Sequence, residues 1–303
     1  MIEVKRKAVL TGHRNPVYAV EASQKPGIIF TAGNDKGVVE WSLKTNSFIK
    51  VLMPVKSSVY ALHAPVFSPV LAVGERSGVI SLFSFPEQKI IAELTHHKQP
   101  VFDLNSVTRK KELLASSEDG TVSVISLTDN ALLYQFKVSG LTVRNIAISH
   151  DEKLVAFGCK DNSIRIYNLD DYSFITELNN HELPVTSLKF SPDGRYLLSG
   201  GRDAKLNIFN LSDYLLKETL VAHMFAIYDI KFHPTKPYFA TSSRDKSIKI
   251  WDAETLKLKK VISREKGIES HSHSVNKICW ESSTELLISV SDDTNVMVWE
   301  VAF

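Results

Sequence analysis

The stretch Ser243–Asp252 reads Ser-Arg-Asp-Lys-Ser-Ile-Lys-Ile-Trp-Asp, and the rest of the chain repeats its pattern. The pattern is a turn aspartate, an alternating apolar run and an aromatic residue. Steps of 42 residues back from Trp251 each reach an aromatic or apolar residue, and one step of 48 forward reaches Trp299. The positions reached backwards are Phe209, Tyr167, Ile125, Phe83 and Trp41. A period of this length indicates a propeller or solenoid whose units cannot bury their faces alone.

The turn aspartate follows the same steps and fails only in the second copy, where Ser77 replaces it. The matching residues are Asp35, Asp119, Asp161, Asp203, Asp245 and Asp293. Each copy also holds four short alternating runs separated by Pro, Gly, Asp or Asn, which are strand and turn signals. In the fifth copy these runs are Val185–Phe190, Tyr196–Ser199, Leu206–Phe209 and Leu215–Leu220. We therefore predict an all-β fold, a seven-bladed β-propeller with four-stranded antiparallel blades.

The two ends of the chain together complete one copy. The repeat extended backwards arrives at Leu10, so residues 3–10 match the fourth strand of a copy whose other strands lie in Val275–Phe303. We expect residues 3–10 to pair with the strand around Val296–Val301. Such pairing closes a ring and leaves no open sheet edge. We expect a single domain over residues 1–303 that is a monomeric ring.

Composition narrows the class of protein further. Apolar residues make up 44% of the 303 residues, and the net charge is +2, which gives no global nucleic-acid or membrane signal. The chain has neither a signal-peptide pattern at its start nor an apolar run of about eighteen residues, so we expect a cytoplasmic protein without membrane partners. Cys159 and Cys279 lie in non-adjacent copies, and we expect reduced, buried thiols.

The residues around the repeated motif resemble the WD-repeat β-propeller family over essentially the whole chain. The resemblance rests on Gly12-His13 at the start of the first copy, on the turn aspartates and on Trp251-Asp252. In that family a His, a Ser or Thr, the turn Asp and the Trp form a hydrogen-bonded tetrad within a blade. Three copies match all four positions: His13, Thr31, Asp35 and Trp41; His223, Thr241, Asp245 and Trp251; His271, Ser289, Asp293 and Trp299.

The other copies depart from this tetrad. The fifth keeps His181, Ser199 and Asp203 but has Phe209, which cannot donate a hydrogen bond. The third has His97 and Asp119 with Ala115 and Ile125, and the fourth keeps Asp161 with Ser139, Phe157 and Tyr167. The second has Val55, Val73, Ser77 and Phe83. We expect blades two to four to depend more on apolar packing.

The sequence does not favour an enzyme. A His and Asp pair could suggest catalysis, but these pairs recur around the chain, whereas catalytic groups need a single site. His96-His97 and His271-Ser272-His273 lack further ligands at zinc-site spacing, and the chain has no phosphate-binding glycine loop, no Gly-x-Ser-x-Gly motif and no activated cysteine. We expect no metal, no cofactor and no catalytic residue.

The family resemblance also implies a binding face at the rim of the central channel. One set of rim residues follows the Val or Ile that opens each first strand: Tyr18, Tyr60, Phe102, Arg144, Thr186, Tyr228 and Asn276. A second set precedes each turn aspartate: Asn34, Arg76, Glu118, Lys160, Arg202, Arg244 and Asp292. Aromatics with arginine are typical of binding surfaces. The alternative is a solvated charged rim. The predicted binding residues are Tyr18, Tyr60, Arg76, Phe102, Arg144, Lys160, Arg202, Tyr228 and Arg244.

Two functions fit this face. The first is an interaction module or scaffold that binds an acidic or phosphorylated segment of a partner protein. The alternative is a nucleic-acid or phosphate-ligand binder with the aromatics as stacking platforms, which the near-neutral charge disfavours. Steep salt dependence of binding would indicate the alternative. The segment Ser263–Ser270 carries the six extra residues of the last step and is either a flap beside this face or an inert insertion.

Overall fold

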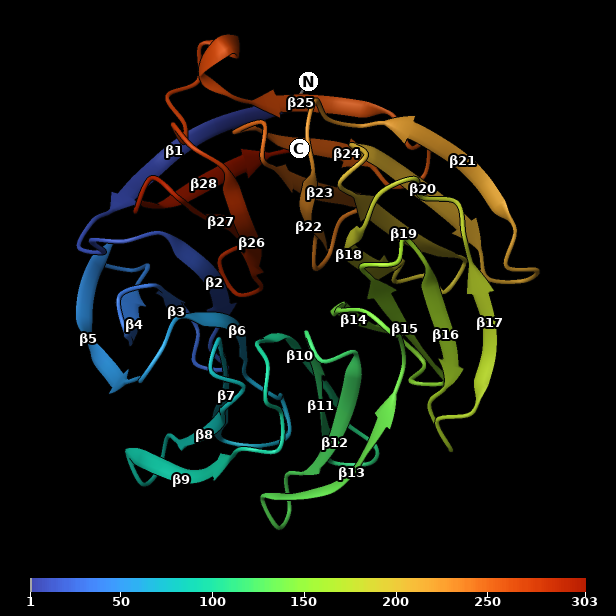
Figure 1. The fold of residues 1–303 in the computed structure, drawn as a ribbon. Helices are drawn as coiled ribbons and strands as arrows, with labels where there is room; N and C mark the ends of the chain where they lie inside the picture. Colours follow the sequence, from blue (N-terminus) through green and yellow to red (C-terminus); the bar gives the residue numbers. More distant parts are fainter. Residues whose placement is uncertain (1) are drawn as a thin grey trace. The chain divides into compact units, whose positions relative to one another are not determined.

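The computed structural model describes residues 2–303. Over these residues the chain forms seven four-stranded antiparallel sheets and one short 3-10 helix (Figure 1). The contacts group into two compact units: a first unit, Met1–Ser58 with Ile227–Phe303, and a second unit, Val59–Ala226. The predicted all-β, seven-bladed fold with four-stranded blades is therefore confirmed, whereas the single domain over residues 1–303 stays a prediction.

Three of the described sheets belong to the first unit. Blade 1 has β2 (Val17–Ala22), β3 (Ile28–Gly33), β4 (Gly37–Ser42) and β5 (Ser47–Pro54). Blade 6 has β22 (Ile227–Phe232), β23 (Tyr238–Ser243), β24 (Ile248–Asp252) and β25 (Leu258–Ile262). Blade 7 has β26 (Val275–Glu281), β27 (Leu286–Ser291), β28 (Val296–Ala302) and β1 (Glu3–Leu10), and the 3-10 helix η1 (Arg264–Lys266) precedes it.

The second unit holds the other four described sheets. Blade 2 has β6 (Val59–His63), β7 (Val70–Glu75), β8 (Ile80–Ser84) and β9 (Lys89–Leu94). Blade 3 has β10 (Val101–Val107), β11 (Glu112–Ser117), β12 (Thr121–Ser126) and β13 (Ala131–Lys137). Blade 4 has β14 (Val143–Ile148), β15 (Leu154–Cys159), β16 (Ile164–Asn168) and β17 (Phe174–Leu178). Blade 5 has β18 (Val185–Phe190), β19 (Tyr196–Gly201), β20 (Lys205–Asn210) and β21 (Leu216–Val221). The four runs predicted for this copy match its strands to within two residues.

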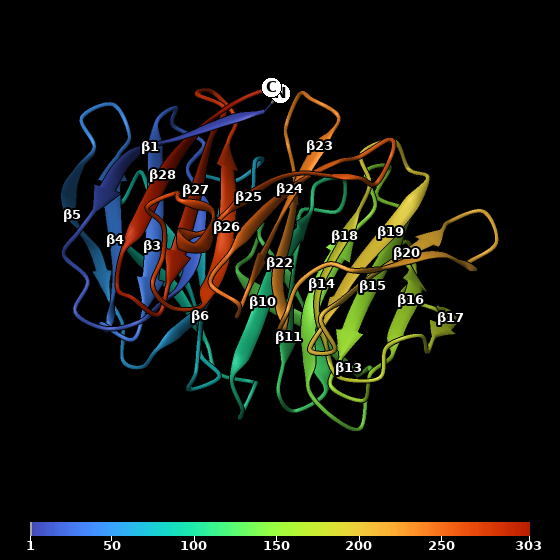
Figure 2. The ribbon, with the colours of Figure 1, turned by 90° about the horizontal axis from the view of Figure 1, so that it is seen from above.

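The N-terminal strand completes blade 7, as the sequence predicts. Strand β1 pairs antiparallel with β28 from Glu3 opposite Ala302 to Leu10 opposite Val296. Both ends of the described chain therefore lie side by side at one end of this sheet (Figure 2). The pairing gives β28 a hydrogen-bonded neighbour on its outer edge, so blade 7 joins residues from the two ends of the sequence.

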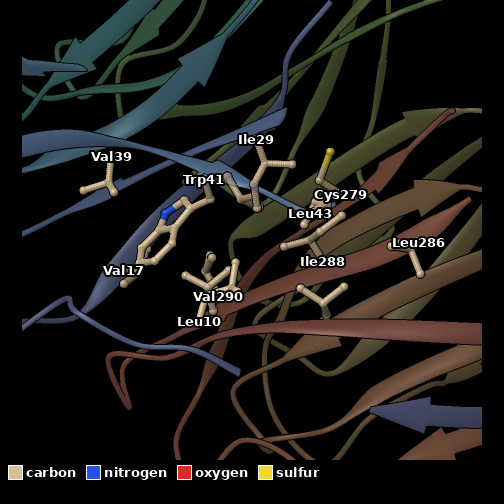
Figure 3. Close-up of a cluster of buried hydrophobic side chains, with 13 residues drawn as sticks. Leu10, Val17, Ile29, Val39, Trp41, Leu43, Cys279, Leu286, Ile288 and Val290 are labelled. Atoms are coloured by element: carbon tan, nitrogen blue, oxygen red, sulfur yellow. The ribbon is translucent and has the colours of Figure 1, made fainter. Parts of the chain in front are cut away.

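The core of the first unit includes an apolar layer between blades 7 and 1. Trp41 and Ile29 of blade 1 lie together with Ile288 and Val290 of blade 7 (Figure 3). Ile29, Ile288 and Val290 come from strands in which every residue is buried, and because successive side chains point to opposite faces, both faces of these strands are covered. Cys279 belongs to the same layer, and it is free and buried, as predicted. Burial raises the pKa of its thiol to about 12.

The first strand of each blade has a bulge directly after its first residue. In the second unit the register with the next strand shifts between Val59 and Ala61, and it shifts likewise around Phe102, Arg144 and Thr186. A β-bulge leaves one residue outside the ladder and re-aims its side chain. The bulged residue in each case is the one that the sequence predicts at the binding face.

Candidate functional site

Two of the three predicted tetrads lie wholly in the first unit, and both form. In blade 1, His13 joins Asp35 through Nδ1 at 2.7 Å and Thr31 through Nε2 at 2.8 Å, and Trp41 Nε1 donates to Thr31 at 2.7 Å. The equivalent tetrad of blade 7 is His271, Ser289, Asp293 and Trp299, with distances from 2.8 to 3.0 Å. These groups hold the loop before the first strand against the rest of its blade.

The residues of the third predicted tetrad are divided between the two units. Trp251 Nε1 donates to Thr241 Oγ1 at 2.9 Å, and Asp245 accepts from the backbone and side chain of Ser247. His223 is 3% exposed and belongs to the second unit. The donor and acceptor of the Trp251 bond are the ones that the family resemblance predicts.

Blades 3 and 5 build the same network from different serines. In blade 5, His181 contacts Asp203 at 2.9 Å and Ser199 at 2.7 Å. In blade 3, His97 contacts Asp119 at 2.9 Å, and its Nε2 lies 3.0 Å from Ser123 on the next strand. Ser123 faces Ala115 across the β11–β12 ladder, so its hydroxyl replaces the one that the second strand lacks. Ala115 and Ile125 also lie in a buried apolar cluster, so blade 3 combines this network with the expected apolar packing.

Blade 4 replaces the histidine by an arginine and a serine. Asp161 accepts from Ser139 Oγ at 2.7 Å and from Arg165 at 2.8 Å, and Arg165 also pairs with Glu177 at 2.9 Å. Phe157 and Tyr167 also lie in a buried apolar cluster, so blade 4 combines this polar network with the expected apolar packing. Blade 2 keeps none of the four tetrad residues, and Phe83, at the tryptophan position, is 2% exposed in an apolar environment. It forms the same four-stranded sheet.

Four of the turn aspartates are held as carboxylates. Burial by itself would raise the pKa of Asp203, but hydrogen bonds from His181 and from backbone N–H groups lower the pKa below its ordinary value. The pKa values of Asp119, Asp161 and Asp293 are lowered in the same way. Each aspartate has a fixed set of donors around it, which is typical of a structural group rather than of a proton donor in a reaction.

Three predicted binding residues lie together at the bulges of the second unit. The rings of Tyr60 and Phe102 stack with centroids 5.3 Å apart and planes 18° apart. The guanidinium carbon of Arg144 lies 4.5 Å from the centroid of Phe102. All three side chains are half-buried. Blades 2, 3 and 4 thus each contribute one side chain to a continuous stack, which we call the aromatic–arginine stack.

Further cations lie at the same end of these blades. This end, the entry face, is where the chain enters the first strand of each blade, and it carries the entry loop and the turn between the second and third strands. Arg76, Lys160 and Arg202 are exposed at such turns. The backbone N–H of Lys160 donates to Thr142 at 2.8 Å, and that of Arg202 donates to Pro184 at 2.9 Å. These bonds tie each cation to the entry loop of its own blade.

The other three predicted binding residues lie in the first unit. Tyr18 and Tyr228 are half-buried at the bulges of blades 1 and 6, and Arg244 is exposed at the turn of blade 6. Their role in binding stays a prediction. The inserted segment Ser263–Ser270 is joined to the N-terminal strand, because Arg6 donates to the backbone oxygen and the carboxylate of Glu269.

Among residues 2–303, no group of three or more His, Cys, Asp or Glu is arranged to hold a metal ion. The described chain contains no helix that is long and apolar enough to cross a membrane.

Comparison with known families agrees with the repeat seen in the sequence. The family WD40, described as WD domain, G-beta repeat, matches residues 4–42, 88–126, 131–168, 172–210, 215–252 and 263–300. The chain belongs to the WD40 family. Members of this family generally act as non-catalytic protein-interaction scaffolds. No curated protein matches the chain.

The family match leaves out residues 43–87, although the first three strands of blade 2 form there. Strands β6, β7 and β8 lie in this stretch and pair in the same order as in the matched copies. The stretch is also the copy in which Ser77 replaces the turn aspartate. A WD40 blade of this protein therefore forms without the residues by which the family is recognised.

One set of surface residues was not predicted from the sequence. Leu141, Leu183, Met224 and Phe225 lie in entry loops of the second unit and are 49%, 48%, 76% and 54% exposed. The sequence position that could have revealed these exposed apolar residues lies two residues after the histidine position of each copy. The chain has there Asn15, Ser57, Gln99, Leu141, Leu183, Phe225 and His273. Apolar residues occupy three successive copies there and polar residues occupy the others.

Proposed function

We propose that the protein is a non-catalytic interaction module that binds an acidic or phosphorylated segment of a partner protein on the entry face of the second unit. The observation that carries the proposal is the aromatic–arginine stack of Tyr60, Phe102 and Arg144 beside exposed cations. Stacking fixes a guanidinium plane before a ligand arrives, which reduces the ordering cost of binding.

Charge and shape support this ligand class. A guanidinium can bind a carboxylate or phosphate through two parallel hydrogen bonds, and Lys adds a point charge. Arg76 and Lys160 flank the stack, because Glu75 pairs with Val59, next to Tyr60, and Lys160 bonds to the loop that precedes Arg144. The aromatic rings supply rigid contact area, so binding would depend on more than charge. We propose Tyr18, Tyr228 and Arg244 as further binding residues of the first unit.

The test is affinity capture from a lysate with two charge-reversed variants. Arg144→Glu with Lys160→Glu alters the proposed face, and Lys111→Glu with Lys153→Glu makes the same charge change at turns between first and second strands. Thermal melting checks that both variants fold. We expect the first variant to lose the partners that the parent captures and the control to retain them.

Two results would contradict the proposal. One is equal capture by the parent and the folded Arg144→Glu, Lys160→Glu variant. The other is capture that nuclease treatment abolishes and that falls steeply with salt, which would assign the face to nucleic acid. Phosphatase treatment of the lysate separates a phosphorylated segment from one whose charge comes from Asp and Glu.

A further inference from the structure

The entry loops of blades 4 and 5 and the loop after β21 form one connected surface. Lys160 N donates to Thr142 in the entry loop of blade 4, and Asn162 Nδ2 donates to Glu182 in the entry loop of blade 5 at 3.0 Å. Arg202 N then donates to Pro184, and Ala222 N donates to Ala204 at 3.2 Å. Each loop is thus hydrogen-bonded to a turn, and each turn to the next loop.

Apolar and basic side chains alternate along this path. Following the hydrogen bonds, the exposed side chains are Leu141, Lys160, Leu183, Arg202 and then the pair Met224 and Phe225. Solvent exposure of such large apolar side chains in neighbouring loops is typical of interaction surfaces rather than of a solubilising coat. We call this row the alternating surface.

The cations of this row keep their charge available, whereas the nearby acids are paired. Glu182 pairs with Lys205 at 2.7 Å, Asp161 pairs with Arg165 at 2.8 Å, and Asp203 is hydrogen-bonded to His181. Within residues 2–303, Lys160 and Arg202 form no ion pair. Lys160 and Arg202 are therefore the exposed charged side chains of the row without an ion pair, and they complement a negatively charged partner.

We infer that the alternating surface binds a partner segment in which apolar and acidic side chains are interspersed. Apolar side chains of the segment contact Leu141, Leu183, Met224 and Phe225, while its carboxylates or phosphates meet Lys160 and Arg202. This inference rests on the proposed function and adds a requirement to it: the segment must carry apolar side chains as well as negative charge. The aromatic–arginine stack adjoins one end of the row, because Arg144 follows Thr142 by two residues.

The test uses three short fluorescent peptides and the full chain. Peptide one alternates leucine with glutamate, peptide two replaces every leucine by serine, and peptide three replaces every glutamate by lysine. Fluorescence anisotropy gives the dissociation constants. We expect peptide one to bind about tenfold more tightly than peptide two, because it buries apolar area, and peptide three not to bind.

Two variants test whether the difference in affinity between peptides one and two comes from the alternating surface. Leu183→Ser with Phe225→Ser should weaken peptide one to the affinity of peptide two and leave peptide two unchanged. The matched control Gln99→Ser, in the entry loop of blade 3, should change neither affinity. All of these positions are exposed, so melting temperatures should stay close to that of the parent.

The outcomes separate this inference from the proposed function. Equal binding of peptides one and two, both weakened by Arg144→Glu, would overturn the inference and leave the proposed function standing. No binding of either peptide would overturn the inference, and the capture experiment with Arg144→Glu and Lys160→Glu would then decide the proposed function. Self-association of the protein that Leu183→Ser removes would assign the surface to a second copy of this chain and would also overturn the inference.

Discussion

Blades 3 and 5 of the second unit share one hydrogen-bond network, which we call the frame, but expose side chains of different chemistry. In both, a histidine joins a turn aspartate and a buried serine, and in both the residue before the aspartate donates its backbone N–H to a proline of the entry loop at 2.9 Å. Blade 5 presents Leu183 and Arg202 on this frame, whereas blade 3 presents Gln99 and Glu118. The two blades thus share the frame and differ in the residues exposed on it, and we propose that binding chemistry differs at these residues.

Lowering the pH should reduce the stability of blades 3 and 5 together, and this is the largest effect that we expect. The pKa values of Asp119 and Asp203 are below the ordinary 3.8 in the folded chain, so their stabilisation is present above this pH and is lost as pH falls through it. His13 adds an earlier loss below pH 6.5, because burial lowers its pKa and only the unfolded chain takes up the proton there. Urea unfolding from pH 8 to pH 3 should show stability falling below about pH 6.5 and falling again below about pH 3.8, and stability that rises toward acid would contradict this account.

Removing the histidine should damage both blades. His97→Ala and His181→Ala each remove one hydrogen-bond donor from a turn aspartate and the histidine partner from a buried serine, which costs about 1–3 kcal/mol of unfolding free energy. The loss should be larger for His181→Ala, because the Asp203 side chain is 3% exposed and that of Asp119 is 21% exposed. Urea unfolding at neutral pH measures both. Equal or reversed losses would show that burial of the aspartate does not set the cost.

The serine exchange gives a sharper test of the shared frame. Ser123→Ala should cost about 1 kcal/mol, as should Ser199→Ala, because each removes a buried hydroxyl that contacts the histidine. Adding Ala115→Ser to Ser123→Ala should recover part of the loss, since Ala115 lies directly opposite Ser123. A neutral Ser123→Ala would mean that blade 3 does not use its network.

The smallest effect on stability is expected for an exchange of the exposed residues. Leu183→Gln and Gln99→Leu should each change the unfolding free energy by less than about 0.5 kcal/mol, because both side chains are exposed. A larger loss for Leu183→Gln would mean that this leucine packs within the blade, and the alternating surface would then have a structural purpose.

The repeat could be predicted from the sequence because strand alternation records which side chains are buried. The repeat predicts the number of blades, including the one that begins within residues 43–87, where the family motif fails. It also predicts the pairing of Glu3 with the end of β28. The Ser123 network could not be predicted, because the hydroxyl comes from a neighbouring strand and is brought to His97 by register alone. The sequence predicts Tyr60, Phe102 and Arg144 as equivalent positions of one proposed binding face, but their mutual stacking depends on packing between blades.

The most direct test of the central claim compares one cation from each of the two blades. Arg202→Glu alters the entry face of blade 5, and Lys98→Glu makes the same kind of charge reversal in the entry loop of blade 3. The probe is a fluorescent peptide of alternating glutamate and phosphoserine, measured by anisotropy. The account predicts that Arg202→Glu weakens binding by about tenfold or more and that Lys98→Glu changes it by less than about twofold. Equal effects of the two variants, or no binding to the parent, would contradict it.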